Sequence, residues 1–153
     1  MFRSIVVGTD GSESASQAVL AAAELAATQP EAVLHIVTVQ KPLSPSAVAA
    51  GEMAAAAPVA AERTWEDEIK NELETTLTRA AETAKRVCDT RIETHGRLGS
   101  PAEVLCDLAR HLQADLIVVG NKGMQGGRRF LGSVPNSVSH HAPCSVLIVD
   151  TTD

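Results

Sequence analysis

Five short apolar runs, separated by segments of helix length, constrain the fold of this chain more than any other feature of its sequence. Four of the runs are rich in Val and Ile, and the third is more mixed, with weak alternation. In chain order they cover residues 3–7, 33–39, 91–97, 116–119 and 145–149. Near-continuous apolar runs of this length are typical of strands that are buried on both faces of a parallel sheet.

Helical patterns fill the first two long intervals between these runs. Ser14 lies three residues before Gln17, a capping-box spacing that predicts a helix reaching to about residue 28. A longer helix is predicted from about 62 to 88, because apolar residues recur there at helical spacing. These residues are Ile69, Leu73, Leu77, Ala80, Ala84 and Val87.

Two further helices are predicted in the second half of the chain. Ser100, Pro101 and Glu103 combine a cap residue, a proline in the first turn and a capping-box glutamate. The apolar stripe of that helix is Val104, Leu105, Leu108 and Leu112. A last short helix is expected to begin near Ser133 and to end before Pro143, which cannot continue a helix.

The strict alternation of strands and helices predicts one α/β domain over residues 1–153. Such alternation implies right-handed crossovers and an open, doubly wound parallel sheet with helices on both faces, a Rossmann-like arrangement. The segment 41–61, rich in Pro and Ala, interrupts the pattern. We expect a flexible surface connection there, and a flap over a ligand is the alternative interpretation.

Composition excludes several classes of partner. The net charge of −6 argues against binding to DNA or to an anionic membrane, and the 2% aromatic content argues against stacking on single-stranded nucleic acid. Three widely spaced cysteines predict neither a disulfide framework nor a CxxC metal site, so we expect a reduced, cytoplasmic protein. No two histidines have the i, i+4 spacing of metal ligands, and no metal site is predicted among them.

The segment 119–134 carries the clearest signal for a ligand. It follows a predicted buried strand, holds Gly120, Gly123, Gly132 and Ser133, and runs into a predicted helix. Glycines allow close approach of the backbone, and the free N–H groups at a helix start bind anions. Residues 116–149 contain no Asp or Glu, while Lys122, Arg128 and Arg129 add positive charge. The alternative is that the glycines only permit a tight loop.

Asp10 is the second candidate for a ligand contact. It follows the first predicted strand, at the sheet edge where ligands bind in such folds, and a carboxylate there can accept from ribose hydroxyls or hold Mg²⁺. The alternative is that Asp10 only organises the turn at Gly11 and Ser12 through an Asx-type hydrogen bond. The chain has neither a Walker A sequence nor a GxGxxG run after the first strand.

Three segments resemble the universal stress protein family. They are the opening Ile-Val-Val-Gly-Thr-Asp-Gly-Ser at 5–12, the pattern Gly120-x-x-Gly123…Gly132-Ser133, and the ending Ala-Pro-Cys-Ser-Val-Leu-Ile-Val at 142–149. The resemblance covers essentially the whole chain. It implies a sheet of order 3-2-1-4-5 and homodimers formed through the last strand, at about 145–150.

The ATP-binding branch of that family uses G-x2-G-x9-G-[ST], whereas eight residues separate Gly123 from Gly132 here. The resemblance implies that Gly120 lies near the ribose, that the backbone of Val39 reads the adenine, and that Asp10 lies near the ribose and a nucleotide-bound Mg. The phosphates would be held from 123 and from 132–134. The predicted binding residues are Gly8, Thr9, Asp10, Val39, Gly120, Lys122, Gly123, Arg128, Gly132, Ser133, Val134 and Pro135.

The sequence therefore predicts an adenine-nucleotide-binding, homodimeric stress-response module. ATP is the expected ligand, with AMP and cyclic AMP as alternatives, and no nucleic acid or membrane is expected as a partner. A slow ATP hydrolase or self-phosphorylating enzyme is a second hypothesis, although no general base is evident beside the predicted phosphate site. A structural dimer without nucleotide binding is the third, and the eight-residue spacing is its best argument.

Overall fold

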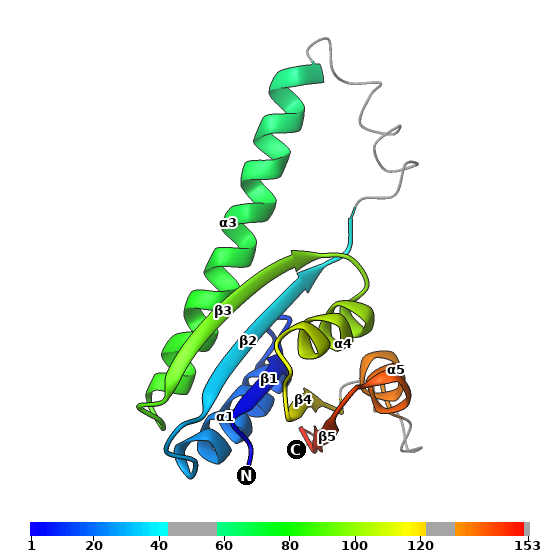
Figure 1. Ribbon diagram of the computed structural model, residues 1–153. Helices are drawn as coiled ribbons and strands as arrows, with labels where there is room; N and C mark the ends of the chain where they lie inside the picture. Colours follow the sequence, from blue (N-terminus) through cyan, green and yellow to red (C-terminus); the bar gives the residue numbers. More distant parts are fainter. Residues whose placement is uncertain (43–57, 122–130, 152–153) are drawn as a thin grey trace.

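The five predicted strands form one parallel sheet of order β3-β2-β1-β4-β5, which confirms the predicted topology (Figure 1). The computed structural model describes residues 1–42, 58–121 and 131–151, with side chains in the second range from Trp65 onward. The strands are β1 (Ser4–Gly8), β2 (Val33–Gln40), β3 (Arg91–Leu98), β4 (Leu116–Gly120) and β5 (Ser145–Val149). Each strand boundary lies within one residue of its predicted place.

Four helices cover the two faces of this sheet within the described residues, so that the chain is doubly wound as expected (Figure 1). They are α1 (Glu13–Ala27), α3 (Pro58–Lys85), α4 (Pro101–His111) and α5 (Ser133–His141). No helix in the described part of the chain has both the length and the apolar character that a membrane crossing needs.

The alternation of side chains along each strand divides the core into two clusters. One cluster joins Ile5, Val7 and Ile36 of the sheet to buried alanines of α1 and α3. The other joins Val6 and Ile117 of the sheet to α4 and α5. The three inner strands, β1, β2 and β4, are buried on both faces and are therefore mostly apolar along their length, whereas the edge strand β3 is more mixed.

The start of α1 differs from the prediction. Ser12, not Ser14, is the N-cap residue, and its Oγ accepts a hydrogen bond of 3.2 Å from the backbone N–H of Ala15. Gly11 has a φ of 79°, in the left-handed region that glycine favours, and this turn places Ser12 in the extended conformation that a cap requires. Ser14 is therefore already inside the helix, and the capping box predicted for it is wrong.

The other helices begin and end close to their predicted limits. Helix α3 starts at Pro58 rather than near residue 62, with the proline at its first helical position. Leu77, Ala80 and Ala84 of its predicted stripe are buried, whereas Val87 lies beyond the helix end and is exposed. Most of the connection predicted at 41–61 falls on residues 43–57, outside the described part of the chain.

The stripe predicted for α4 is correct only in part. Leu105 is buried, but Val104, Leu108 and Leu112 only flank the core, and Ala102, Cys106 and Ala109 are its other buried residues. The small side chains of Ala102, Cys106 and Ala109 allow α4 to pack closely on the sheet. Ser100 is the N-cap residue, but its side chain makes no capping hydrogen bond. The three cysteines are free thiols, and burial raises the pKa of Cys106 and Cys144, which makes them unreactive.

Candidate functional site

A cavity of about 280 Å³ opens at the carboxyl ends of β1, β2 and β4. This is the point where the strand order reverses, with β2 on one side of β1 and β4 on the other. Doubly wound sheets bind their ligands at such a point. The cavity is lined by Gly8, Thr9, Asp10, Ser14, Ala15, Val37, Val39, Pro101, Leu105, Val119, Gly120, Ser133, Val134 and Pro135.

The cavity brings together residues that were predicted to form one site although they lie far apart in the sequence. The predicted residues in its lining are Gly8, Thr9, Asp10, Val39, Gly120, Ser133, Val134 and Pro135. Gly132 is the N-cap residue of α5, directly before Ser133. Lys122, Gly123 and Arg128 lie outside the described residues. Six lining residues were not predicted: Ser14, Ala15 and Pro101, which reach the cavity from the first turns of α1 and α4, and the apolar Val37, Leu105 and Val119.

The loop after β1 forms one wall and is held by local hydrogen bonds. The backbone N–H of Thr9 donates to the carbonyl oxygen of Val37 at 2.8 Å, and the Thr9 hydroxyl accepts from the N–H of Gly11 at 3.2 Å. Asp10 accepts from the N–H of Ser12 at 3.0 Å, through its Oδ1. Asp10 thus makes the Asx-type turn contact that the sequence left open. Asp10 also lines the cavity, so this structural role places it beside a bound ligand.

The first turn of α5 forms the opposite wall. Its N-cap residue, Gly132, has no side chain to satisfy the first N–H groups, and the first turn carries no acidic residue. The N–H of Asn136 bonds to the carbonyl oxygen of Gly132 at 3.1 Å, while Pro135 has no N–H. The N–H groups of Ser133 and Val134 remain at the positive end of the helix dipole, which is the arrangement that binds anions.

Apolar side chains and two glycines shape the inner part of the cavity. Val37, Val39 and Leu105 give it an apolar wall. A Cβ added at Gly8 would lie 3.0 Å from Cδ1 of Leu105, and one at Gly120 would lie 3.2 Å from a methyl carbon of Thr151. A larger residue at either strand end would therefore push against the side chain of Leu105 or Thr151. The cavity joins an apolar region, suited to a planar ring, with N–H donors suited to a phosphate.

Asn121, directly after β4, ties the end of that strand to the chain that follows β5. Its Oδ1 accepts from the backbone N–H of Thr151 at 3.0 Å and from the Thr151 hydroxyl at 2.9 Å. Its Nδ2 donates to Oδ1 of Asp150 at 2.9 Å. Both Asn121 and Thr151 are buried. These bonds fix the position of Gly120 at the cavity, and the sequence analysis did not predict them.

Replacing Asn121 by leucine is expected to destabilise the protein. The change leaves the buried N–H and hydroxyl of Thr151 without their acceptor, which costs about 1–3 kcal/mol. Urea unfolding followed by circular dichroism measures the loss. Asn71→Leu, at an exposed position of α3, is the matched control and should change the free energy of unfolding by less than about 0.5 kcal/mol. Equal effects of the two changes would contradict this account of Asn121.

Comparisons of the sequence and of the structure with known proteins agree with the fold described above. The Universal stress protein family model matches residues 1–150. Universal stress protein Rv1636 of Mycobacterium tuberculosis H37Rv is 36% identical over 152 residues, which are 99% of this chain and 98% of that protein. A crystal structure of a universal stress protein in complex with cAMP is 36% identical, with a TM-score of 0.70, and covers 99% of this chain and 98% of its own.

A universal stress protein from Archaeoglobus fulgidus shares the fold, with a TM-score of 0.74 at 22% identity over 98% of this chain and 100% of its own. The family match spans both walls of the cavity, from the loop after β1 to the first turn of α5. This chain therefore belongs to the universal stress protein family.

Proposed function

We propose that this chain binds an adenine nucleotide in the cavity between the loop after β1 and the first turn of α5. The observation that carries the proposal is the position of the α5 N–H groups, at Ser133 and Val134, beside an apolar wall formed by Val37 and Val39. The phosphate would accept from these N–H groups, and the base would pack against the valines. The similar universal stress protein crystallised with cAMP supports this class of ligand.

ATP is the ligand that we propose first, with AMP and cyclic AMP as the alternatives. Asp10 supports a nucleotide with a free ribose or a bound Mg²⁺, because it is an acidic residue in the cavity lining and carboxylate oxygens are ligands that Mg²⁺ prefers. The protein would act as a regulatory stress-response module in the cytoplasm. Its free cysteines support that location, since thiols persist in reducing compartments.

Calorimetric titration with ATP, AMP and cyclic AMP, with and without Mg²⁺, tests this proposal. We expect saturable heat with one nucleotide per chain for at least one of the three, and no comparable heat for GTP. A dependence on Mg²⁺ that is lost in Asp10→Asn would assign the metal contact to Asp10. If none of the adenine nucleotides gave heat or raised the melting temperature, the cavity would not be a nucleotide site.

We also propose that two copies pair through the edge of β5. Among the described strands, β5 pairs with β4 alone, and its residues Ser145–Val149 carry no charge. Leu147 on this strand is 38% exposed. The opposite edge, β3, carries Arg91, Glu93 and Arg97 instead. Charged edges resist pairing with another chain, whereas an uncharged apolar edge invites it.

Leu147→Lys is expected to break this dimer, because pairing would bury the new charge without a partner. Leu98→Lys is the matched control, since Leu98 is also an exposed leucine but lies on the other edge strand, β3. Light scattering coupled to gel filtration should show a fall from twice the 16.0 kDa chain mass to that mass in the first variant alone. An unchanged mass for Leu147→Lys would contradict the proposed interface.

A further inference from the structure

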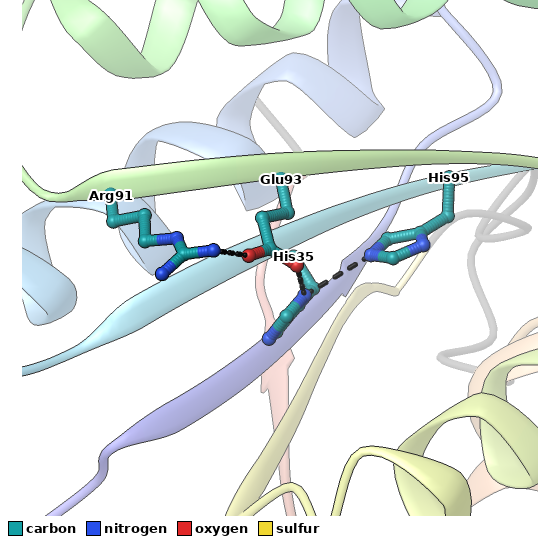
Figure 2. Close-up of polar contacts among 4 residues, drawn as sticks. All are labelled: His35, Arg91, Glu93 and His95. Carbon is teal, nitrogen blue, oxygen red and sulfur yellow. Dashed lines mark hydrogen bonds and ion pairs between the residues drawn. The ribbon is translucent and has the colours of Figure 1, made fainter.

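Two histidines and a glutamate gather outside the cavity, on the two strands at the β3 edge of the sheet. His35 comes from β2, and Glu93 and His95 come from β3 (Figure 2). The parallel register pairs His35 with Glu93 and Val37 with His95. Since alternate residues of a strand share a face, all three side chains project on the side of the sheet where α4 and α5 pack. The strand register, rather than proximity in sequence, brings them together.

The ligand atoms of these three side chains lie close together. Nδ1 of His35 lies 3.1 Å from Nε2 of His95 and 3.5 Å from Oε2 of Glu93. All three ligand atoms lie within 4.8 Å of one another. Ligand atoms placed about 2.0–2.2 Å from a tetrahedral zinc ion are themselves about 3.3–3.6 Å apart. The two separations from His35 thus lie close to those of a metal-bound set, and the Glu93 carboxylate and the His95 ring need only small movements to complete it.

The surroundings of the cluster hold its side chains in place. His35 is only 5% exposed, and Glu93 and His95 are partly buried beside it. The Arg91 guanidinium contacts Oε1 of Glu93 at 2.6 Å, so it orients the carboxylate with Oε2 toward His35. Such outer contacts are typical of carboxylates that ligate metals.

We propose that His35, Glu93 and His95 bind a divalent transition-metal ion, with zinc as the ion that suits them best. Two imidazole nitrogens and one carboxylate oxygen make a three-ligand zinc set with a fourth position for water. Nitrogen ligands disfavour Mg²⁺ and Ca²⁺, which take oxygen ligands. Bound metal would link β2 to β3 and stabilise the sheet edge, because a ligand that binds only the folded state raises its stability.

The alternative role of the cluster is a hydrogen bond between neutral imidazoles, with one ring as donor and the other as acceptor. That contact needs no metal, and it would add one side-chain hydrogen bond to the backbone pairing that already joins β3 to β2. The two roles differ in one measurable property, which is a saturable metal affinity that depends on all three residues.

The experiment titrates the chelator-treated, full-length protein with Co²⁺ and then with Zn²⁺, in the absence of nucleotide. We expect one Co²⁺ per chain, with the visible absorption of a four- or five-coordinate site, its displacement by Zn²⁺, and a higher melting temperature with Zn²⁺. His95→Ala and Glu93→Gln each remove a proposed ligand, so each should weaken binding by at least the roughly tenfold to hundredfold that the loss of an outer contact costs. The Glu93→Gln side chain keeps its size, so this variant tests the site if His95→Ala does not fold.

His140→Ala combined with His141→Ala is the matched control, because these adjacent histidines are exposed on α5, which packs against β4 and β5 at the other end of the strand order from β3. It should keep the wild-type affinity. Ser133→Asp should also keep it, which separates this site from the nucleotide cavity. The proposal is overturned if the wild type shows no saturable binding, if Glu93→Gln binds Co²⁺ as tightly as the wild type, or if the α5 variant loses the affinity.

Discussion

Ser133→Asp is expected to weaken adenine-nucleotide binding severely while the protein remains as stable as the wild type. The new carboxylate would stand in the first turn of α5, at the N–H groups proposed to hold the phosphate. Two like charges about 4 Å apart at an effective dielectric constant of about 20 repel by about 4 kcal/mol. Even a third of that energy is a loss of roughly tenfold in affinity, so we expect tenfold or more.

The same substitution favours the helix itself. An acidic side chain in the first turn interacts well with the helix dipole, which contributes about 0.3–1 kcal/mol. The nucleotide affinity should therefore fall while the free energy of unfolding stays the same or rises. A misfolded variant would instead lose both its affinity and its stability. Calorimetric titration gives the affinity, and urea unfolding gives the stability.

Ser133→Asn is the matched control for this charge. Asparagine has nearly the size of aspartate and remains neutral, and its side-chain amide can donate a hydrogen bond in place of the Ser133 hydroxyl. This variant should therefore bind the nucleotide within about threefold of the wild-type affinity, since exchanging one neutral donor for another changes the binding free energy little. If Ser133→Asp and Ser133→Asn bound equally well, the phosphate would not lie at the start of α5.

Ile117→Ala is expected to have the largest effect on stability. Ile117 is the second residue of β4 and is fully buried, in the cluster that joins the sheet to α4 and α5. Truncation of such a side chain removes apolar contacts and leaves a cavity, at a cost of about 2–5 kcal/mol. Because Ile117 does not line the nucleotide cavity, the folded variant should keep its affinity.

Val87→Ala is the control, because Val87 is 39% exposed beyond the end of α3. It should change the free energy of unfolding by less than about 0.5 kcal/mol. Urea unfolding measures both variants. A cost for Ile117→Ala as small as that for Val87→Ala would contradict the two-cluster description of the core. Together, the Ser133 and Ile117 variants separate the binding surface from the scaffold that supports it.

The strands could be predicted from the sequence because their determinants are local, whereas their order came from the resemblance to the universal stress protein family. Strands buried on both faces are apolar at most positions, so runs such as 116–119 stand out from the alanine-rich helices around them. The glycines at 8, 120 and 132 also mark strand and helix ends, and so place the cavity. The features that were predicted correctly depend on residues that lie close together in the sequence.

The features that were missed depend on backbone geometry or on distant residues. Ser12 and Ser14 are chemically equivalent caps, and only the positive φ of Gly11 decides between them. The role of Asn121 depends on where the chain after β5 lies. The spacing of residues within a single helix or strand does not relate His35 to His95, whereas the register of β2 and β3 places them together. Aligning the two strand sequences as parallel neighbours is the sequence signal that brings these histidines together.

The central claim is that nucleotide phosphate binds at the backbone N–H groups of Ser133 and Val134. The most direct test follows the ¹⁵N–¹H resonances of the protein by nuclear magnetic resonance during titration with ATP and cyclic AMP. The account predicts that the amides of Ser133 and Val134 shift most, together with those of Gly8 and Gly120 across the cavity. Saturable binding that leaves the Ser133 and Val134 amides unmoved would contradict it.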